Sequence, residues 1–273
     1  MTDSSTTVPR IGVIGNGVVG NATARCWMEH ATVKVWDKVP SKCTHDLNTT
    51  LDSDVVFICL PSPQKTPTRE CDTSIIEDFC NMLAGSAPSV TYAIRSTVPV
   101  GFTQRMRDQY KLINLVHNPE FLTARCAVTD AQLPARNIIG GEIITGYDIC
   151  ELYSRRFPGV PLHRVTSNES ELIKLGLNSF FAVKIAYFNE LRSFADKVGC
   201  DWSRVMEGLI SDGRIAHSHT RIPGPDGKFG FGGACLPKDL ANLIHCMVSA
   251  GLDNLVTSSA YTRNELIDRP RKS

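Results

Sequence analysis

The sequence predicts an α/β protein in which a parallel sheet, covered by helices on both faces, precedes an all-helical domain with one long central helix. Short apolar runs alternate with helix-compatible segments up to about residue 165, and a glycine cluster follows the first run. From residue 168 to 198 the only glycine or proline is Gly176, so one helix of unusual length is expected there. Because strands that alternate with helices form parallel sheets, we expect two domains, residues 1–167 and 168–273.

Composition excludes several classes of protein. The chain has 273 residues, with 29 Lys and Arg against 28 Asp and Glu, which gives a net charge of +1. This balance argues against a nucleic-acid partner or a polybasic membrane-surface protein. The N-terminal segment has no basic stretch followed by an apolar one, and the longest uninterrupted apolar run is Val55 to Leu60. We therefore expect no signal peptide and no membrane span.

The ten cysteines include no C-x-x-C pair, and several lie in apolar runs or expected helices, where thiols behave as small apolar side chains. Reduced thiols are typical of the cytoplasm, so we expect a cytoplasmic protein without a zinc site. His217 and His219 are two residues apart but lack a third ligand nearby, so we expect no metal centre.

The expected elements of the first domain follow from its apolar runs. Six strands are expected: Ile11 to Ile14, the run that ends at Asp37, Val55 to Leu60, Val90 to Ile94, Leu112 to Val116 and Asn137 to Ile139. Helices are expected between some of them, at Thr73 to Leu83 and Val100 to Tyr110.

The glycine cluster has the spacing of a dinucleotide-binding loop. The segment Gly15-Asn16-Gly17-Val18-Val19-Gly20 reads G-x-G-x-x-G between a strand and a helix, where backbone amides and the positive helix end can hold a pyrophosphate. Asp37 follows the next strand, 22 positions after Gly15, and is placed to accept from a ribose 2′-hydroxyl. The pattern predicts a Rossmann-type domain that binds NAD rather than NADP, although Lys38 softens the preference. The alternative is a glycine turn with a solvated aspartate.

Two strand exits carry polar residues. Thr97 lies in Arg-Ser-Thr-Val-Pro and Glu120 in His-Asn-Pro-Glu. Ligands of open α/β sheets bind beyond the carboxyl ends of the strands, so both side chains are candidates for the nicotinamide end of the cofactor. Ordinary turn chemistry explains the same residues equally well.

The helical part begins with the long helix, ahead of which Ser167 offers an N-cap. Helices are also expected at Trp202 to Ile210, Pro237 to Ala250 and Asn254 to Ile267. The apolar residues of the long helix extend beyond one narrow stripe, so we expect a homodimer formed through the region 168–198.

Lys174 and Asn178 stand at i and i+4 on this helix, where both can donate to one developing oxyanion. A solvated helix face is the alternative, and it is favoured for a lone pair of this kind.

The run Gly230-Phe231-Gly232-Gly233-Ala234-Cys235-Leu236-Pro237-Lys238-Asp239 is the most informative in the sequence. Its glycines let the backbone approach a ligand, and Pro237 and Asp239 indicate the start of a helix. Cys235 therefore lies near a positive helix end and near Lys238, a setting that favours the thiolate.

These segments together resemble the nucleotide-sugar dehydrogenases, the UDP-glucose/GDP-mannose dehydrogenase family. The matching stretches are IGVIGNGVVG, LPSPQKTPTRECDTS, RSTVPVGFT, NPEFL, ELIKLGLNSFFAVKIAYFNE, SDGRI and FGFGGACLPKD, in the order of the family and over nearly the whole chain.

The resemblance implies two successive hydride transfers to NAD, which turn a primary alcohol into a carboxylate. Carried over by motif, Cys235 would be the nucleophile, and Lys174 and Asn178 would stabilise the oxyanion while also touching the substrate. Asp239, Thr97 and Glu120 would position or activate water, with Thr97 also near the cofactor and Glu120 near the substrate. Arg214 and Gly232 would contact the nucleotide sugar, Arg214 possibly from a partner subunit.

Two departures from the family pattern bear on this assignment. The family commonly reads NPEFL-x-Glu-Gly, whereas this chain has Ala124 and Arg125 at the last two positions, so thioester hydrolysis would either depend more on Glu120 or be slow. Family members also continue into a second Rossmann-like domain that binds the nucleotide, whereas this chain stops at Ser273. Two other functions therefore stay open: a two-electron oxidoreductase similar to the 3-hydroxyacid dehydrogenases, and a catalytically weak NAD-binding dimerisation module.

Overall fold

A computed structural model describes residues 8–65, 68–87 and 89–270, and the chain divides into two compact units. The first comprises Met1–Pro63 and Cys71–Lys174, and the second comprises Gln64–Glu70 and Leu175–Ser273. The division falls inside the long helix α7 (Ser167–Lys197), so the first turns of this helix belong to the unit that contains the sheet.

The first unit is built on a seven-stranded, mostly parallel sheet in the order β2-β1-β3-β4-β5-β6-β7. The strands are β1 (Arg10–Ile14), β2 (Thr32–Trp36), β3 (Val55–Ile58), β4 (Thr91–Ile94), β5 (Leu115–His117), β6 (Asn137–Gly140) and β7 (Leu162–Val165). Among the described strands, β5 and β6 form the one antiparallel pair, so β6 and β7, which are parallel to each other, run opposite to the other five. The predicted α/β fold is confirmed, with β7 as an additional edge strand.

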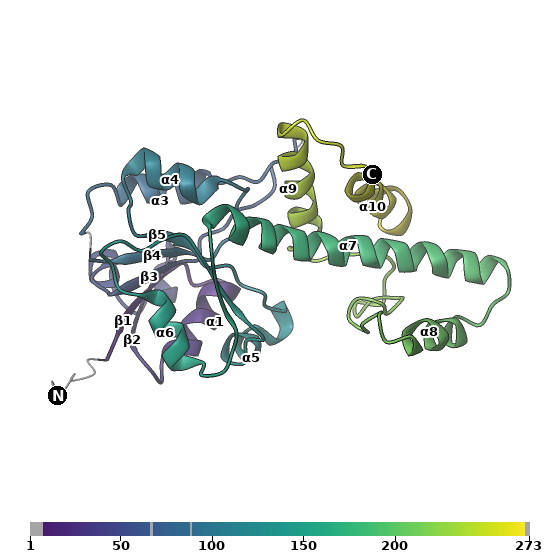
Figure 1. The fold of residues 1–273 in the computed structure, drawn as a ribbon, viewed down its shortest axis with the longest axis horizontal. Coiled ribbons are helices and arrows are strands. Elements are labelled where there is room, and N and C mark those ends of the chain that lie inside the picture. Colours follow the sequence, from purple (N-terminus) through teal and green to yellow (C-terminus); the bar gives the residue numbers. More distant parts are fainter. Residues whose placement is uncertain (1–7, 66–67, 88, 271–273) are drawn as a thin grey trace. The chain divides into compact units, whose positions relative to one another are not determined.

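Helices cover both faces of this sheet (Figure 1). One face carries α1 (Val18–Trp27), α5 (Ala127–Gln132) and α6 (Ile149–Arg156), and the other carries α3 (Ser74–Met82) and α4 (Phe102–Tyr110), while α2 (Leu47–Leu51) is a short helix ahead of β3. Strand β3 shows why the sheet forms, because Val55 and Phe57 pack into one core and Val56 and Ile58 into the other. A strand buried on both faces is apolar at every position.

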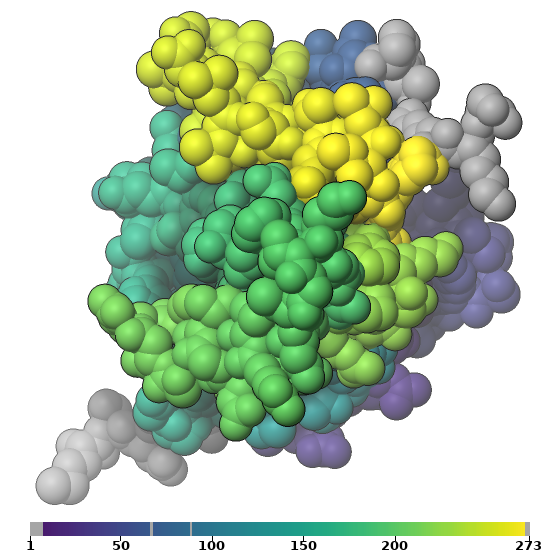
Figure 2. Space-filling model, turned by 90° about the vertical axis from the view of Figure 1, so that its right-hand side faces the viewer, coloured from purple at the N-terminus to yellow at the C-terminus, as the bar shows by residue number. Residues whose placement is uncertain are grey.

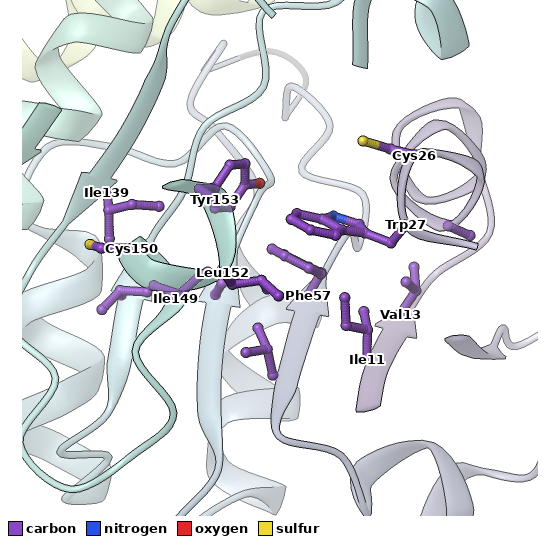
Figure 3. Packing of buried hydrophobic residues seen from close by; sticks show 14 of the residues in the cluster. Ile11, Val13, Cys26, Trp27, Phe57, Ile139, Ile149, Cys150, Leu152 and Tyr153 are labelled. Carbon is purple, nitrogen blue, oxygen red and sulfur yellow. The ribbon is translucent and has the colours of Figure 1, made fainter. Parts of the chain in front are cut away.

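An aromatic cluster fills the core beneath α1 and α6. The ring of Trp27 stacks on Phe57 at a centroid distance of 6.3 Å and meets the ring of Tyr153 edge-on at 5.3 Å. Figure 3 shows the three rings converging from α1, β3 and α6. Burying a side chain of this size contributes about 1.5–3 kcal/mol, so the cluster fixes both helices on the sheet.

The second unit is helical and contains no β-strand within the described part of the chain. It consists of most of α7, then α8 (Trp202–Ser211), α9 (Leu236–Ser249), α10 (Leu255–Arg263) and a π-helical turn, Asn264–Asp268. Its core joins Ala182 and Ala186 of α7 to Leu240 of α9 and Tyr261 of α10. The predicted long helix and the three shorter ones are confirmed. Every helix of the described residues is too short or too polar to cross a lipid bilayer.

Buried polar groups fix the first turns of α7 within the first unit. The hydroxyl of Ser170 lies 2.9 Å from Nδ1 of His117, at the end of β5. The carboxylate of Glu171 accepts hydrogen bonds from the backbone amides of Gly101 (2.6 Å) and Thr103 (2.8 Å). Burial raises the pKa of Glu171, although these bonds oppose the shift. Because Gly101 and Thr103 open α4, Glu171 acts as a cap for that helix from a distant part of the sequence.

Burial of His117 predicts a loss of stability in mild acid. Burial lowers the pKa of this fully buried imidazole to about 3, so the folded state holds it neutral while the unfolded chain takes up a proton below about pH 6.5. Stability is therefore retained above pH 6.5 and lost as the pH falls, by about 2 kcal/mol between pH 7 and pH 5. His117→Asn, which places an amide near the position of Nδ1, should lower the pH dependence of the unfolding free energy by this amount. Urea titrations of both proteins at the two pH values measure it, and equal slopes would contradict the assignment.

Candidate active site

Three glycines shape the loop between β1 and α1, for different reasons. Gly15 has a φ of +91°, and a Cβ there would lie 2.7 Å from the carbonyl oxygen of Cys59. A Cβ on Gly20 would lie 1.7 Å from the carbonyl oxygen of Gly15, so the helix could not start so close to the strand. A Cβ on Gly17 would meet no atom within 4 Å. The protein itself therefore requires the first and third glycines, whereas Gly17 leaves open backbone where a phosphate can approach the helix end.

Asp37 is held beside this loop by backbone amides. Its carboxylate accepts hydrogen bonds from the amides of Val39 (2.8 Å) and Asn16 (2.6 Å), and these bonds hold the pKa of Asp37 below its usual range. A cavity of about 420 Å³ lies beside it, lined also by Lys38, Cys43 and His45. An ionised carboxylate at this position can accept from ribose hydroxyls, so the residues present fit an adenine dinucleotide.

Val18 and Val19 complete the glycine loop at the start of α1. Val18 is exposed at the start of α1, and the carbonyl of Val19 accepts a hydrogen bond from the Thr23 hydroxyl. Strand order reverses between β1 and β3, and the crevice at such a switch point is where open α/β sheets bind ligands. The glycine loop lies at this crevice.

Lys174 and Glu120 form a buried ion pair in the first unit. The Lys174 ammonium lies 2.9 Å from Oε1 of Glu120 and donates to its backbone carbonyl at 2.6 Å, and the side chains are 4% and 10% exposed. Burial alone would raise the pKa of Glu120, but Lys174 and the amide of Leu122 hold it below its usual range. A solvated helix face is therefore the wrong alternative for Lys174.

Thr97 and a cavity beside Glu120 also belong to the first unit. Thr97 is buried at the end of β4, and its carbonyl accepts from the hydroxyl of Ser62 at 2.7 Å. A cavity of about 290 Å³ borders Glu120, and the buried Arg95 lines it while donating hydrogen bonds to Asn118 and Tyr153. A buried ion pair contributes little net stability, and an ionised carboxylate beside a cavity is a common feature of catalytic sites.

Asn178 and Asp239 are paired in the second unit. The Asn178 amide donates to Oδ2 of Asp239 at 2.6 Å, and Lys238 Nζ lies 2.8 Å from the other oxygen. The Asp239 side chain is only 1% exposed. Lys174 and Asn178 thus each contact their own carboxylate, and their joint donation to a substrate oxyanion stays a prediction.

Cys235 stands at the N-cap position of α9, with Pro237 in the first turn of the helix. Its side chain is exposed, whereas burial raises the pKa of the Cys59, Cys80 and Cys150 thiols to about 11, 12 and 11. The structure therefore places an exposed thiol at the N-terminal end of a 14-residue helix.

The remaining candidates lie in loops of the second unit. Arg214 is exposed and pairs through two nitrogens with Asp212, at 2.5 and 2.7 Å. A Cβ on Gly232 would lie 2.2 Å from a guanidinium nitrogen of Arg269. The ring of His219 stacks on Phe181 at 3.9 Å. Across residues 8–65, 68–87 and 89–270, no three His, Cys, Asp or Glu side chains are grouped as metal ligands would be.

Sequence reasoning missed the partners of these residues. Lys174 and Glu120 are 54 positions apart, and Asn178 and Asp239 are 61 apart. Both carboxylates lie in motifs that the sequence singled out, NPEFL and CLPKD, but nothing in a single sequence indicates which cation or amide meets which acid.

Comparison with known proteins places these residues in a family. Residues 34–155 match the NAD binding domain of the UDP-glucose/GDP-mannose dehydrogenase family, and residues 168–266 match its central domain. A UDP-glucose 6-dehydrogenase from Campylobacter jejuni is 30% identical over 195 residues, which cover 71% of this chain and 48% of that protein. The chain thus spans about half the length of that relative.

Two further relatives extend the similarity over nearly the whole chain. A UDP-glucose 6-dehydrogenase from Streptococcus pneumoniae is 27% identical over 301 residues, covering 94% of this chain and 74% of that protein. The solved structure of a UDP-glucose dehydrogenase from Pyrobaculum islandicum shares the fold with a TM-score of 0.82 at 23% identity, covering 97% of this chain and 70% of that one. Because two domains of one family follow each other here and together account for most of the chain, the protein belongs to the UDP-glucose/GDP-mannose dehydrogenase family and carries its NAD-binding domain.

Proposed function

We propose that this chain forms the NAD-binding and central parts of a nucleotide-sugar 6-dehydrogenase that oxidises UDP-glucose to UDP-glucuronate. The observation that carries the proposal is the exposed Cys235 at the start of α9, in a chain that also has a dinucleotide-binding loop. A single alcohol oxidation has no use for a covalent thiol, whereas a four-electron oxidation needs a group that retains the aldehyde.

The cofactor assignment follows from the first unit. The open backbone at Gly17 and the start of α1 would hold the diphosphate, Asp37 would accept from the ribose, and Thr97 would lie near the nicotinamide. When bound, NAD supplies the hydride acceptor for both oxidation steps.

The proposed reaction passes through an aldehyde, a thiohemiacetal and a thioester. The primary alcohol loses a hydride and a proton and becomes an aldehyde. The Cys235 thiolate adds to the aldehyde carbon, and the resulting oxyanion is protonated to a thiohemiacetal. Loss of a second hydride and a proton gives a thioester, which water cleaves to the carboxylate and the free thiol. Lys174 and Asn178 are assigned as donors to the oxyanion. Their side-chain nitrogens donate to the carboxylates of Glu120 and Asp239 in this structure.

Water activation is assigned to the carboxylates, with Thr97 as a positioning hydroxyl. Glu120 is held ionised by Lys174, which suits a group that takes a proton from water. Ala124 opens an exposed 3-10 turn, Ala124–Cys126, at the position where the family commonly has a second glutamate. Glu120 and Asp239 would therefore both activate the water that hydrolyses the thioester. Arg214 and Gly232 are assigned to substrate binding.

Two other functions compete with this proposal. A two-electron oxidoreductase similar to the 3-hydroxyacid dehydrogenases would leave Cys235 without a role. A weak NAD-binding dimerisation module would not need two buried carboxylates, each with a donor beside it. We also propose a cytoplasmic location, since the buried cysteines Cys26, Cys80 and Cys150 are not joined in disulfides, as is usual in a reducing compartment.

A homodimer through α7 is part of the proposal. Phe180, Tyr187 and Phe194 repeat every seven residues along α7 and are 59%, 59% and 63% exposed. A recurring apolar stripe of this kind is typical of a helix that packs on another. Light scattering at micromolar concentration should give twice the chain mass of 30.0 kDa, and Tyr187→Arg should shift the protein to the monomer. A wild-type monomer would contradict the proposal.

NAD should bind more tightly than NADP. The ionised Asp37 would meet a 2′-phosphate with like charge, so we expect the Kd for NADP to exceed that for NAD by about tenfold or more, as 1.4 kcal/mol of repulsion gives. Asp37→Asn should narrow this ratio by removing the charge. Calorimetric titration of both cofactors needs no substrate, and equal affinities in the wild type would refute the assignment.

Cys235→Ser should abolish net four-electron oxidation while leaving NAD binding intact. A serine hydroxyl is far less nucleophilic than a thiolate, so turnover should fall by about two orders of magnitude or more. Cys200→Ser is the matched control, since Cys200 is an exposed thiol between α7 and α8. NADH release and mass spectrometry of thiol-linked intermediates with UDP-glucose measure the effect. A mutant within a few-fold of wild type would instead favour the two-electron oxidoreductase.

A further inference from the structure

The loop that leads to Cys235 is held by side chains far from it in the sequence. We define this loop as Phe229 to Gly233. The amide of Gly230 donates to the side-chain oxygen of Asn189 on α7 at 3.0 Å. The side-chain amide of Asn264 makes two hydrogen bonds with the backbone of Phe231, accepting from its N–H at 2.8 Å and donating to its carbonyl at 3.1 Å. Both asparagines are buried, so they satisfy backbone groups that would otherwise be buried without partners.

Arg269 adds a third set of contacts. Its guanidinium donates to the carbonyl of Phe229 at 2.7 Å and to that of Gly230 at 3.2 Å. The same group pairs with Asp226 at 2.8 Å. Only arginine can reach three acceptors with one planar group. In Figure 2 the yellow atoms at the end of the chain lie directly beside yellow-green atoms of the segment that precedes α9.

We call Asn189, Asn264 and Arg269 the clamp. The glycines of the loop show which parts of its backbone the clamp occupies and which part is open. A Cβ on Gly230, where φ is +66°, would lie 2.3 Å from the side-chain oxygen of Asn264. A Cβ on Gly232 would displace the Arg269 guanidinium, from which it would be 2.2 Å. Gly233 is different, because a Cβ there would meet nothing within 4 Å. The clamp thus accounts for two glycines, and the open backbone lies at Gly233, two residues before Cys235.

The clamping residues are themselves fixed by a local distortion of the chain. Residues Asn264–Asp268 form a π-helical turn, closed by a hydrogen bond from the Arg269 amide to the Asn264 carbonyl at 2.7 Å. Arg263 pairs with the buried Asp268 at 3.2 Å within the same turn. Single π-turns are rare and occur frequently at functional sites. Here the turn sets both Asn264 and Arg269 against one loop.

We propose that Asn264 and Arg269, together with Asn189, are positioning residues that fix the loop for nucleotide-sugar binding. This inference rests on the proposed function for the identity of the substrate. A glycine-rich loop has many conformations when free, and ordering it on binding costs affinity. Holding Phe229 to Gly232 in one conformation beforehand removes that cost and fixes the path of the chain toward Gly233 and Cys235.

The test compares Arg269→Met and Arg269→Lys with a control, Arg204→Met, in the full chain. Arg204 is an exposed arginine of α8 that forms a long ion pair with Asp201, at 3.7 Å. Hydrogen exchange of the peptide 226–236, followed by mass spectrometry without ligand, is the first measurement. We expect exchange about tenfold faster in Arg269→Met, an intermediate rate in Arg269→Lys, and no change in the control.

Steady-state kinetics is the second measurement. The KM for UDP-glucose should rise about tenfold in Arg269→Met while the KM for NAD stays within twofold, and Arg269→Lys should recover part of the loss. Equal changes in both KM values would overturn the positioning role. A wild-type chain without turnover would count against the proposed function only, and the exchange comparison would still decide whether the clamp exists.

Asp226→Asn keeps the inference testable if Arg269→Met fails to fold. Asp226 is at the surface, so its substitution weakens one anchor of Arg269 without opening the core. We expect a smaller acceleration of exchange in the same peptide and an unchanged Tm. Unchanged exchange in both Arg269→Met and Asp226→Asn, or exchange that accelerates throughout the helical unit, would overturn the inference.

Discussion

The arrangement of the first unit depends on how the start of α7 is bound to the sheet. Three residues on its first two turns, Ser170, Glu171 and Lys174, meet His117, the start of α4 and Glu120. All are polar and buried, and each would cost free energy if its partner were removed. This requirement forces β5, α4 and α7 into one register, because any other packing would leave a charge or an imidazole without a partner. The same contacts hold the pKa of Glu120 below its usual range beside a cavity, and the proposed role of this carboxylate in water activation rests on that geometry.

Glycine is used in two ways in this chain. At Gly15, Gly20, Gly230 and Gly232 the protein's own atoms occupy the place of a side chain. At Gly17 and Gly233 the space is open, and these two residues lie beside the start of α1 and just ahead of α9. Gly17 and Gly233 leave room for a ligand to approach the backbone, and the occupied glycines hold the loops that contain these two residues.

Much of the fold was predictable because local patterns determine it. The buried strands read as apolar runs, the glycine loop had its strand and helix in place, and α7 lacked any breaker but Gly176. Strand β7 escaped prediction because an edge strand is half solvated, and its sequence Leu-His-Arg-Val lacks an apolar run. Helix α6 is short and carries Arg155 and Arg156 in its last turn, which obscured its apolar face. The pairing of Lys174 with Glu120, and the clamp made by Asn264 and Arg269, join segments that only the folded chain brings together. A single sequence records the types of such residues but not their distances.

Strand β7 has a further consequence for how the protein behaves in a crowded solution. Among the described strands it ends the sheet, so one side of its backbone can offer amides and carbonyls to another chain. Its two central residues, His163 and Arg164, are exposed, and Arg164 pairs with Asp148 across the surface. A second sheet approaching this edge would have to desolvate that charge and bring two copies of it together. His163 and Arg164, which interrupt the apolar pattern of β7 in the sequence, thus also disfavour the pairing of this edge with another sheet.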